Sequence, residues 1–565
     1  MATDVTEQAS KMNRSTKSER RTKDSISVAK QEWLIAIGSG LLLWAAFPPI
    51  GCWPLAFFAP VGWIRLAKNE DATGKRYFKI LYCAGFIHWM LLVHWIRIPH
   101  VLNNIGWIVL AGYLAIYLPI FVVATRTMVC RWKIPSVFAA PIVWTSLELA
   151  RGYLFTGFSI SLVGHALSQQ TTLIQIADIF GAYGVSFIVI AAAAGIAELF
   201  PTKPAKMKLW PLGFASLLIV MSIVYGDLRR KDSFEITNGK EPTTIALIQG
   251  VYDTVFGNDQ EQDQIADVRA FADYQRLSEE AIVENDMIDL IVWPESMFST
   301  RYPVVRFSEP LLPAPGSSLT AKELSEIQNL HQFDVEFISA LLKTPMLVGS
   351  ERYYQERDQI QRFNSALLIS TDGKFKSVYD KNHPVMFGEY IPFGKIAPWL
   401  YTLTPMGTGL NAGTQPASVE IEKIRIAPCI CFENTIPHLI RRQTAELRNQ
   451  NESPDCLVTI TNDGWFWGSS LLDVHFACGV FRAIEMRLPM LIAANTGFSG
   501  WIDAKGQVLA KGGRREESVV LSEIFPATKE MTIYQSLGDS PFVLFTVLTM
   551  LAILDAYRQS IKSKS

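Results

Sequence analysis

The sequence predicts a two-part protein, in which a set of membrane helices carries a separate α/β domain. Two observations favour this class. The chain has 565 residues, a mean hydropathy of +0.19 and 19% charged residues, a mixture that fits a membrane part joined to a water-facing part. Long apolar segments fill most of residues 32–226, whereas residues 240–525 alternate short β-rich runs, turns and helical stretches.

Eight apolar segments predict eight transmembrane helices, seven before the α/β domain and one after it, at 538–558. The second segment is shorter than the roughly 20 residues that a helix needs to cross a bilayer. It is either re-entrant or crosses where the bilayer is thin. The segments cover residues 32–50, 53–67, 77–98, 104–125, 137–155, 174–199, 209–226 and 541–557.

Positive charges predict the orientation of these segments. The basic tail at 1–30 lacks an apolar face and is expected to be disordered and cytoplasmic. If all eight segments cross, Lys and Arg gather in the loops on the side of the tail, and the turns at 49–53 and 99–104 carry none. The basic run at 229–231 lies on the other side, but it precedes a long domain, which translocates largely regardless of charge. We therefore expect a seven-helix membrane domain, an extracytoplasmic α/β domain and a cytoplasmic end at 559–565.

Residues 240–525 are predicted to form layers of helices and sheet. Continuous apolar runs, such as residues 288–293, are typical of strands that are buried on both faces. Helices are expected at 262–284 and 473–487. The predicted strands are 244–248, 290–293, 345–348, 365–370, 424–431, 457–461, 490–493 and 500–503.

Composition and cysteine spacing argue against several classes of function. The formal net charge of −1 gives no support for a nucleic-acid partner. The seven cysteines are odd in number and irregularly spaced, which argues against a disulfide framework. The chain has no Cys-x-x-Cys pair and no His/Cys grouping with zinc-ligand spacing, so no metal site is predicted.

Three predicted strands run into residues with complementary chemistry, namely Glu295, Lys381 and Cys431. Ligand sites of α/β proteins commonly lie at such strand ends, where the three side chains could meet. A carboxylate can take the proton of a thiol, and a lysine can stabilise the oxyanion of a tetrahedral intermediate. Each residue also has an ordinary explanation: a helix-start charge, a solvated turn residue and a small buried side chain. Taken singly, the ordinary explanations are favoured.

The segments around these residues carry a resemblance. They read Val-Trp-Pro-Glu-Ser at 292–296, Tyr-Asp-Lys-Asn-His at 379–383 and Cys-Phe-Glu at 431–433. They resemble the signature strand ends of the nitrilase, or carbon–nitrogen hydrolase, superfamily, whose Glu–Lys–Cys triad lies in an α-β-β-α sandwich.

Further motifs are similar to one membrane-bound family of that superfamily, the apolipoprotein N-acyltransferases. The similarity spans about residues 32–557, and the predicted order of seven helices, sandwich and closing helix is also that of the family. The motifs are Phe-Gly-Glu-Tyr-Ile-Pro-Phe at 387–393, Thr-Asn-Asp-Gly-Trp-Phe at 461–466, His475, Arg-Ala-Ile-Glu at 482–485, Asn-Thr-Gly-Phe-Ser at 495–499, Trp144, Glu148, Arg151, 156–158 and 181–186.

The resemblance implies a role for each matching residue. Glu295 would be the general base, Lys381 would stabilise charge and Cys431 would be the nucleophile. Glu389 would be a further essential acid, although it could be an ordinary turn carboxylate. Glu433 would support the site, and a helix-start charge is an equally weighted explanation for it.

Two residues near the predicted nucleophile, Cys429 and Phe432, bear on these roles. Cys429 competes with Cys431, because strand alternation puts both side chains on one face. We favour Cys431, which lies at the strand end before the aromatic–Glu pair, and expect Cys429 to be a core residue. Phe432 stands where the family usually has Tyr, which puts a hydrogen bond of the substrate site in doubt. Other departures, at 384–387 and at Trp467, and an uncertain substitute at Phe256 also concern substrate preference.

The reaction implied is acyl transfer without a cofactor. Cys431 would attack an ester of a membrane phospholipid and form a thioester, and the α-amino group of the S-diacylglyceryl cysteine of a lipoprotein would then attack the thioester. This is the last step of lipoprotein maturation and would take place at a bacterial cytoplasmic (inner) membrane. Two alternatives remain: a membrane-tethered hydrolase with the same triad, and a scaffold without activity, against which the intact triad weighs.

Two other features have open interpretations. The Pro-rich stretch at 302–315 and the Met386-Phe387 pair are candidate lids over an acyl chain or ordinary surface loops. Glu148 and Arg151 stand three residues apart on one predicted helix. They are expected to form a structural ion pair, with admission of phospholipid headgroups as the alternative.

Overall fold

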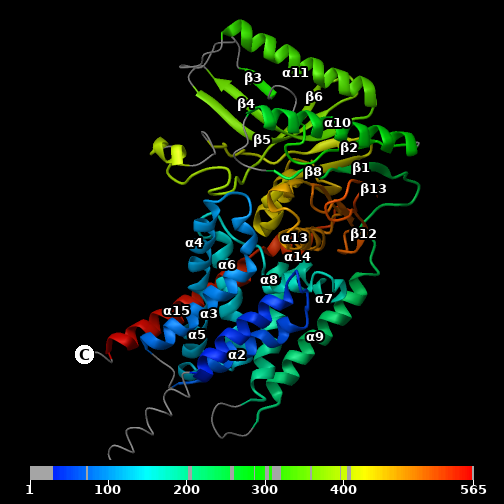
Figure 1. The fold of residues 1–565 in the computed structure, drawn as a ribbon. Coiled ribbons are helices and arrows are strands. Elements are labelled where there is room, and N and C mark those ends of the chain that lie inside the picture. Colours follow the sequence, from blue (N-terminus) through cyan, green and yellow to red (C-terminus); the bar gives the residue numbers. More distant parts are fainter. Residues whose placement is uncertain are drawn as a thin grey trace, which may run out of the picture.

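The computed structural model describes residues 30–562, except 71–73, 201–206, 255–259, 286, 299–303, 308–319, 357–358, 395 and 404–408. Helices form the lower part of the molecule in Figure 1, and two β-sheets with their own helices form the upper part. The predicted cationic tail lies outside the described residues, apart from residue 30, which begins a helix.

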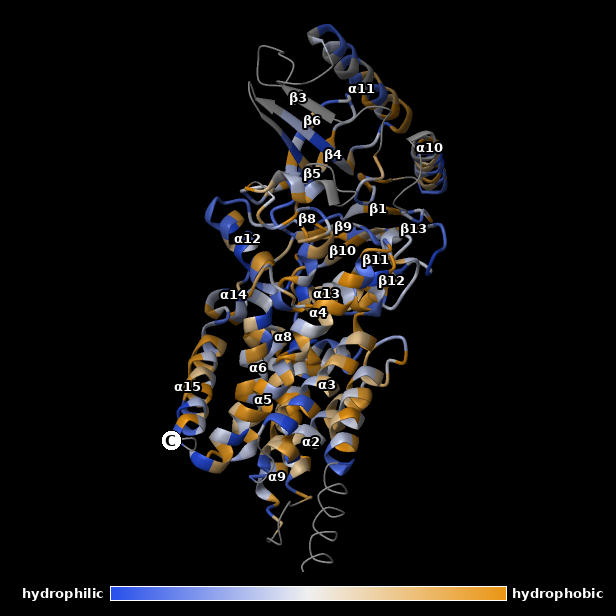
Figure 2. Cartoon of the chain, turned by 60° about the vertical axis from the view of Figure 1, so that its left-hand side comes forward, coloured by the Kyte–Doolittle hydropathy of each residue, from blue (hydrophilic) through white to orange (hydrophobic). Residues whose placement is uncertain are grey.

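Every predicted apolar segment is helical, and Figure 2 shows these helices as predominantly hydrophobic. The fourth segment divides into two helices, and the last helix continues beyond the predicted end at 558. The helices are 30–46, α2 (Leu55–Lys68), α3 (Lys75–Leu92), α4 (Asn103–Ala115), α5 (Tyr117–Arg126), α6 (Ser136–Tyr153), α8 (Ala177–Ala197), α9 (Trp210–Arg229) and α15 (Ser540–Lys562).

Within the described ranges, four helical stretches are long and apolar enough to cross a membrane: Asn103–Arg131, α8, α9 and α15. The protein is therefore membrane-bound. The second apolar segment forms α2, which has 14 residues with Pro60 inside it. At 1.5 Å per residue it rises about 21 Å, less than the ~30 Å hydrocarbon core.

The upper part contains two sheets, and every predicted strand coincides with an observed one. The first sheet has the order β13-β1-β2-β4-β5-β6, with β3 also paired to β4, and the second has the order β12-β11-β10-β9-β8-β7. The strands are β1 (Thr243–Gln249), β2 (Leu290–Val292), β3 (Val304–Phe307), β4 (Met346–Glu356), β5 (Gln359–Ile369), β6 (Phe375–Asp380), β7 (Val419–Ile421), β8 (Ile424–Ile430), β9 (Cys456–Asn462), β10 (Met490–Asn495), β11 (Gly500–Ile502), β12 (Val508–Lys511) and β13 (Ser518–Ile524).

Side chains along these strands point alternately to the two faces of each sheet, and this arrangement defines four layers. In β1, Ile245 and Leu247 point into the core between the two sheets, whereas Ala246 and Ile248 point outward. The outward side chains pack under α10 (Gln260–Glu284) and α11 (Ala321–Leu342), which cover the first sheet. The second sheet is covered by α12 (Pro437–Asn449) and α13 (Leu471–Met486), so the domain is an α-β-β-α sandwich.

Shorter helices complete the connections between these elements. They are η1 (His94–Arg97), η2 (Thr127–Arg131), η3 (Val163–Leu167), α7 (Thr171–Ile174), η4 (Pro398–Leu403), η5 (Cys431–Thr435), η6 (Asp463–Phe466) and α14 (Ile533–Leu537). Two of them, η5 and η6, begin directly after β8 and β9 and so turn the chain at the end of the second sheet.

The sandwich rests on the membrane helices through α13, whose apolar side chains share one continuous core with α2, α6 and α8. Ion pairs strengthen this junction. The Asp178 carboxylate of α8 accepts hydrogen bonds from Arg487 at 2.6 Å and from Arg229 at 3.0 Å. Glu485 of α13 accepts from the backbone N–H of Ala182 at 2.8 Å. The two parts of the chain therefore meet in a packed and charged interface.

Candidate active site

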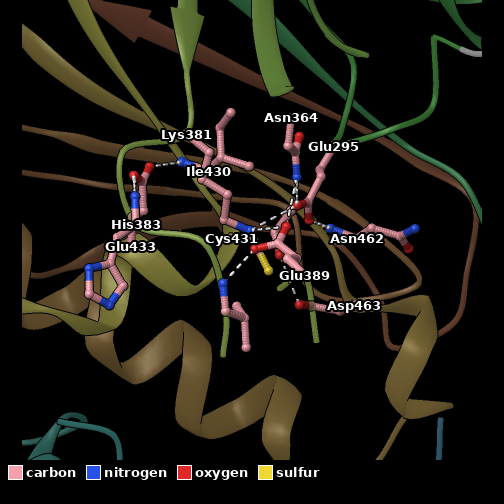
Figure 3. A network of polar contacts seen from close by, with 12 residues as sticks. Glu295, Asn364, Lys381, His383, Glu389, Ile430, Cys431, Glu433, Asn462 and Asp463 are labelled. Carbon is pink, nitrogen blue, oxygen red and sulfur yellow. Dashed lines mark hydrogen bonds and ion pairs between the residues drawn. The ribbon is translucent and has the colours of Figure 1, made fainter. Parts of the chain in front are cut away.

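The three strand-end residues predicted from the sequence come together in one site (Figure 3). Glu295 follows β2 and Lys381 follows β6, both in the first sheet, whereas Cys431 follows β8 in the second. The site therefore lies where the ends of both sheets meet. It faces the side of the sandwich that carries α12 and α13 and, beyond them, the membrane helices.

Lys381 is the cation at the centre of the site and is only 1% exposed. Its ammonium nitrogen lies 2.8 Å from Glu389 Oε1 and 3.3 Å from Glu295 Oε1. Burial lowers the pKa of Lys381, but attraction to these two carboxylates outweighs burial and holds the pKa well above its usual value. Lys381 is therefore charged.

Glu295 is buried but well supplied with hydrogen-bond donors. Its Oε2 accepts from the backbone N–H of Asn462 at 2.8 Å, and its Oε1 accepts from the side-chain amide of Asn364 at 2.6 Å. Burial raises the pKa of Glu295, but Lys381 and these donors lower it by more, so the net shift is downward. The carboxylate is thus ionised and able to accept a proton.

Cys431 is a free, partly buried cysteine at the first residue of η5. Its backbone φ of +54° lies in the left-handed region, which is unusual for a residue other than glycine. Burial and the neighbouring Glu295 carboxylate raise the pKa of the Cys431 thiol well above its usual value, against the opposing pull of Lys381. The resting residue is therefore a neutral thiol beside an ionised carboxylate.

The predicted shared face of Cys429 and Cys431 is wrong. Cys429 packs into the core under α12 and α13, whereas Cys431 packs against the core between the sheets. The left-handed backbone of Cys431 ends the strand alternation, so its side chain turns away from that of Cys429. Cys429 is 2% exposed, its sulfur lies 3.0 Å from Thr459 Oγ1, and burial raises its pKa to about 12.

Glu389 lies in the site, although it follows Lys381 by eight residues in a loop. Its Oε1 binds Lys381 and also accepts from Asn364 at 3.1 Å, while its Oε2 accepts from the backbone N–H of Val385 at 2.7 Å. The carboxylate thereby fixes the loop at 385–389 against the lysine. Asn364, an isolated amide in β5 that the sequence analysis did not single out, joins both carboxylates.

Glu433 is fully buried and connects the strand end of Lys381 with that of Cys431. Its Oε1 accepts from the backbone N–H groups of Asn382 and His383, at 2.7 and 3.0 Å. Its Oε2 accepts from Ile430 N–H at 2.8 Å. Burial raises the pKa of Glu433, and the donors oppose this shift. Glu433 therefore holds the two backbone segments together rather than contacting the lysine ammonium.

Phe432 lies beside the site and is linked to the helical part through His383. Its ring stacks on His383, with ring centroids 6.2 Å apart. His383 Nε2 in turn donates to the carbonyl of Thr156, in the loop after α6, at 2.7 Å. The segment that follows Lys381 is thus bound to a loop of the helical part.

The remaining candidates have mixed outcomes. Glu148 and Arg151 form no ion pair with each other; Glu148 accepts from Trp144 and from Val163 N–H, and Arg151 donates to backbone carbonyls. Phe387, of the proposed Met386-Phe387 lid, is 66% exposed. The other proposed lid, at 302–315, lies outside the described residues except for β3. Phe256 also lies outside them.

In the part of the chain that the structure describes, no group of three His, Cys, Asp or Glu side chains is placed to hold a metal ion. The site instead offers one thiol, one ammonium group and two carboxylates, a set suited to nucleophilic attack on a carbonyl carbon.

Family models match both parts of the chain. The family model described as apolipoprotein N-acyltransferase N-terminal domain matches residues 39–195, and that described as carbon-nitrogen hydrolase matches residues 262–534. Among solved structures, Nit3 of Saccharomyces cerevisiae, a member of the nitrilase superfamily, is 14% identical with a TM-score of 0.35, covering 54% of this chain and 95% of its own.

Relatives match over almost the whole length. An apolipoprotein N-acyltransferase of Rhodopirellula baltica is 30% identical over 560 residues, covering 92% of this chain and 96% of the relative. One of Geobacter metallireducens is 30% identical over 530 residues, covering 92% and 94%. Because both the helical and the catalytic parts match in one alignment, the chain belongs to the apolipoprotein N-acyltransferase family of the carbon–nitrogen hydrolase superfamily.

Proposed function

We propose that this protein transfers an acyl chain from a membrane phospholipid to the α-amino group of the S-diacylglyceryl cysteine of lipoproteins, through a thioester on Cys431. The observation that carries the proposal is the meeting of Cys431, Glu295 and Lys381 in one buried site of a membrane-bound chain. Glu389, Glu433 and Phe432 support the site, and the chemistry needs no cofactor.

The first half-reaction uses the protonation states of the resting site. Glu295 takes the thiol proton as the sulfur of Cys431 attacks the ester carbonyl of the phospholipid. The carbonyl oxygen becomes negative, and the ammonium group of Lys381 stabilises it. Collapse of this intermediate breaks the ester C–O bond, and the lysophospholipid leaves with the proton from Glu295. Cys431 is left as a thioester and Glu295 is again ionised.

The second half-reaction repeats these roles with an amine. The α-amino group attacks the thioester carbonyl and passes a proton to Glu295, while Lys381 again stabilises the oxyanion. The C–S bond then breaks, an amide forms, and the sulfur regains its proton from Glu295. The thioester divides one difficult ester-to-amide exchange into two easier steps.

The same proposal includes a membrane topology. The tail at 1–30 is cytoplasmic, residues 31–228 form seven crossings, residues 240–525 form the extracytoplasmic domain, 538–558 crosses back, and 559–565 is cytoplasmic. Basic residues in the last turn of α2, Arg65 and Lys68, support a cytoplasmic end for the short second helix. The membrane is the bacterial inner membrane.

The thioester is the most direct test of the reaction. Full-length protein in vesicles of acyl-labelled phospholipid is expected to gain the mass of one acyl chain on the peptide that contains Cys431, and hydroxylamine is expected to release it. Addition of a synthetic diacylglyceryl-cysteine lipopeptide should convert the label to amide. Release of free fatty acid without amide would support the hydrolase alternative and reject the transferase.

The topology has its own test. A cysteine introduced at Glu241, whose side chain is 84% exposed, should react with a membrane-impermeant thiol reagent added to the outer side of spheroplasts. A cysteine at Lys562, at the end of α15, should react only after the membrane is opened. The reverse pattern would contradict the proposed orientation.

A further inference from the structure

A buried histidine connects the nucleophile to a carboxylate that takes no part in the proposed reaction. His475 lies on α13, Asp463 begins η6 after β9, and both are at most 5% exposed. His475 Nδ1 lies 3.2 Å from Asp463 Oδ1, and His475 Nε2 lies 3.0 Å from the backbone carbonyl oxygen of Cys431. The imidazole therefore bridges two elements at the end of the second sheet.

The two partners of His475 define its protonation. An ionised carboxylate and a peptide carbonyl are both acceptors, so each ring nitrogen must carry a hydrogen to bond with them. Burial lowers the pKa of His475, but the adjacent Asp463 raises it by more, so the net pKa lies above its ordinary value. Asp463 Oδ1 also accepts from the hydroxyl of Thr461 at 3.0 Å. The geometry thus holds a doubly protonated ring in one orientation.

The carbonyl that His475 binds belongs to a strained residue. Cys431 has φ +54°, a left-handed conformation that is unfavourable for a residue with a Cβ. The pairing of β8 with β9 ends at Ile430, which faces Ile460, so the β8–β9 ladder does not extend to Cys431. His475 supplies the partner of its carbonyl, and this charge-assisted bond favours the strained conformation.

From this arrangement we infer that Asp463 and His475 are positioning residues, which keep Cys431 in its left-handed conformation and so direct its thiol toward Glu295 and Lys381. The inference rests on the proposed function only in taking Cys431 as the nucleophile. A small displacement of a reacting atom can cost about 100-fold in rate, so the loss of this bond is expected to be felt in the chemical step.

The test measures the reactivity of Cys431 separately from acyl transfer. In the full-length protein, His475→Phe keeps a ring but removes both hydrogen bonds. We expect its rate of alkylation at Cys431 by iodoacetamide, followed by peptide mass, to fall about 10- to 100-fold. The rate of acyl-enzyme formation should fall in parallel, while the KM for phospholipid changes less than about twofold, because substrate contacts are kept.

Two further variants keep the test decisive. His438→Phe is the control: His438 is a half-buried histidine, stacked on Tyr153, and its replacement should leave both rates unchanged. Asp463→Ala removes the carboxylate that raises the pKa of His475 and weakens the bond of the ring to Cys431, so both rates should fall about fivefold. If His475→Phe does not fold, Asp463→Ala carries the test.

The outcomes separate the two proposals. Alkylation within twofold of wild type in His475→Phe, or in Asp463→Ala where that variant carries the test, overturns the positioning role. A rise of about 10- to 100-fold in the KM for phospholipid, with an unchanged rate of acyl-enzyme formation, overturns it as well. A wild-type enzyme that forms no acyl-enzyme, but whose alkylation falls in His475→Phe, would reject the proposed function and keep the positioning role.

Discussion

The active site and the junction below it bury ionic clusters of opposite composition. In the site, two carboxylates, Glu295 and Glu389, surround the single cation Lys381. In one cluster of the junction, two cations, Arg487 and Arg229, pair with the carboxylate of Asp178. The site therefore keeps a basic oxygen beside the thiol. The Asp178 cluster joins the two parts of the chain, because Asp178 lies on α8 and Arg487 follows α13.

The neighbours of each cluster explain the difference. Arg487 also donates to Gln175 Oε1 at 2.6 Å and to the carbonyl of Ala504 at 3.2 Å, so neutral acceptors complete its hydrogen bonding. In the site, burial and the neighbouring carboxylate raise the pKa of the Cys431 thiol, so the thiol keeps its proton in the resting protein. Variants in the site should therefore lose rate, and variants in the junction should lose stability.

The largest expected effect is that of Cys431→Ala, which removes the proposed nucleophile. Acyl transfer should fall at least about 10⁴-fold, without loss of thermal stability, because the thiol is only partly buried. The rate of amide formation from labelled phospholipid measures the effect. Cys429→Ala is the matched control and should form the acyl-enzyme normally; full activity in Cys431→Ala would exclude this residue as the nucleophile.

Glu295→Gln should come next, since it keeps the shape of the side chain but removes the proton acceptor. A loss of about 10²–10⁴-fold in the rate of acyl-enzyme formation is expected. Glu420→Gln, at a surface carboxylate that pairs with Arg425 at 3.1 Å, should be indistinguishable from wild type. A Glu295→Gln enzyme that acylates at the normal rate would show that another group takes the proton.

The junction should respond in the opposite way. Arg487→Met leaves the buried Asp178 with one partner fewer, and breaking a buried ion pair costs about 3 kcal/mol or more. The unfolding temperature of the purified protein should fall, while the rate constant of the folded enzyme stays near wild type. Arg276→Met, in an exposed cluster with Glu280 and Glu517, should cost less than about 1 kcal/mol. Equal losses of stability in the two variants would contradict a structural role for the Asp178 cluster.

The smallest expected effect is that of pH on the first half-reaction. The pKa of Glu295 is shifted down, and those of Cys431 and Lys381 are shifted up, so all three keep their resting protonation between about pH 5 and 9. These three groups should therefore give no limb in the single-turnover rate of acyl-enzyme formation across this range. A sharp limb near pH 7 that persists in His475→Phe would indicate a different proton acceptor.

Local sequence was sufficient for many of the elements and for the positions of three reactive residues at strand ends. Buried strands such as β2 and β8 are short apolar runs, and reactive residues directly after them are visible without the fold. β13, which pairs with β1, was not predicted, because its strand character depends on a partner more than 260 residues away in the chain.

The finer geometry of the site required the fold. Asn364 is an ordinary polar residue within β5 until the pairing of the strands brings it against Glu295 and Glu389. The left-handed backbone of Cys431 also has no local signal, since neither glycine nor asparagine stands there, and the strand alternation predicted the wrong direction for its side chain. Tertiary contacts determine both features.

The shared core between α13 and the membrane helices has a practical consequence for anyone dissecting this enzyme. Side chains of the membrane helices partly bury Phe481, Ile484 and their neighbours on α13. Excision of the sandwich alone would therefore expose a broad apolar surface. Such a fragment should aggregate or bind detergent rather than behave as a soluble hydrolase. The sandwich therefore uses the bundle as part of its own interior.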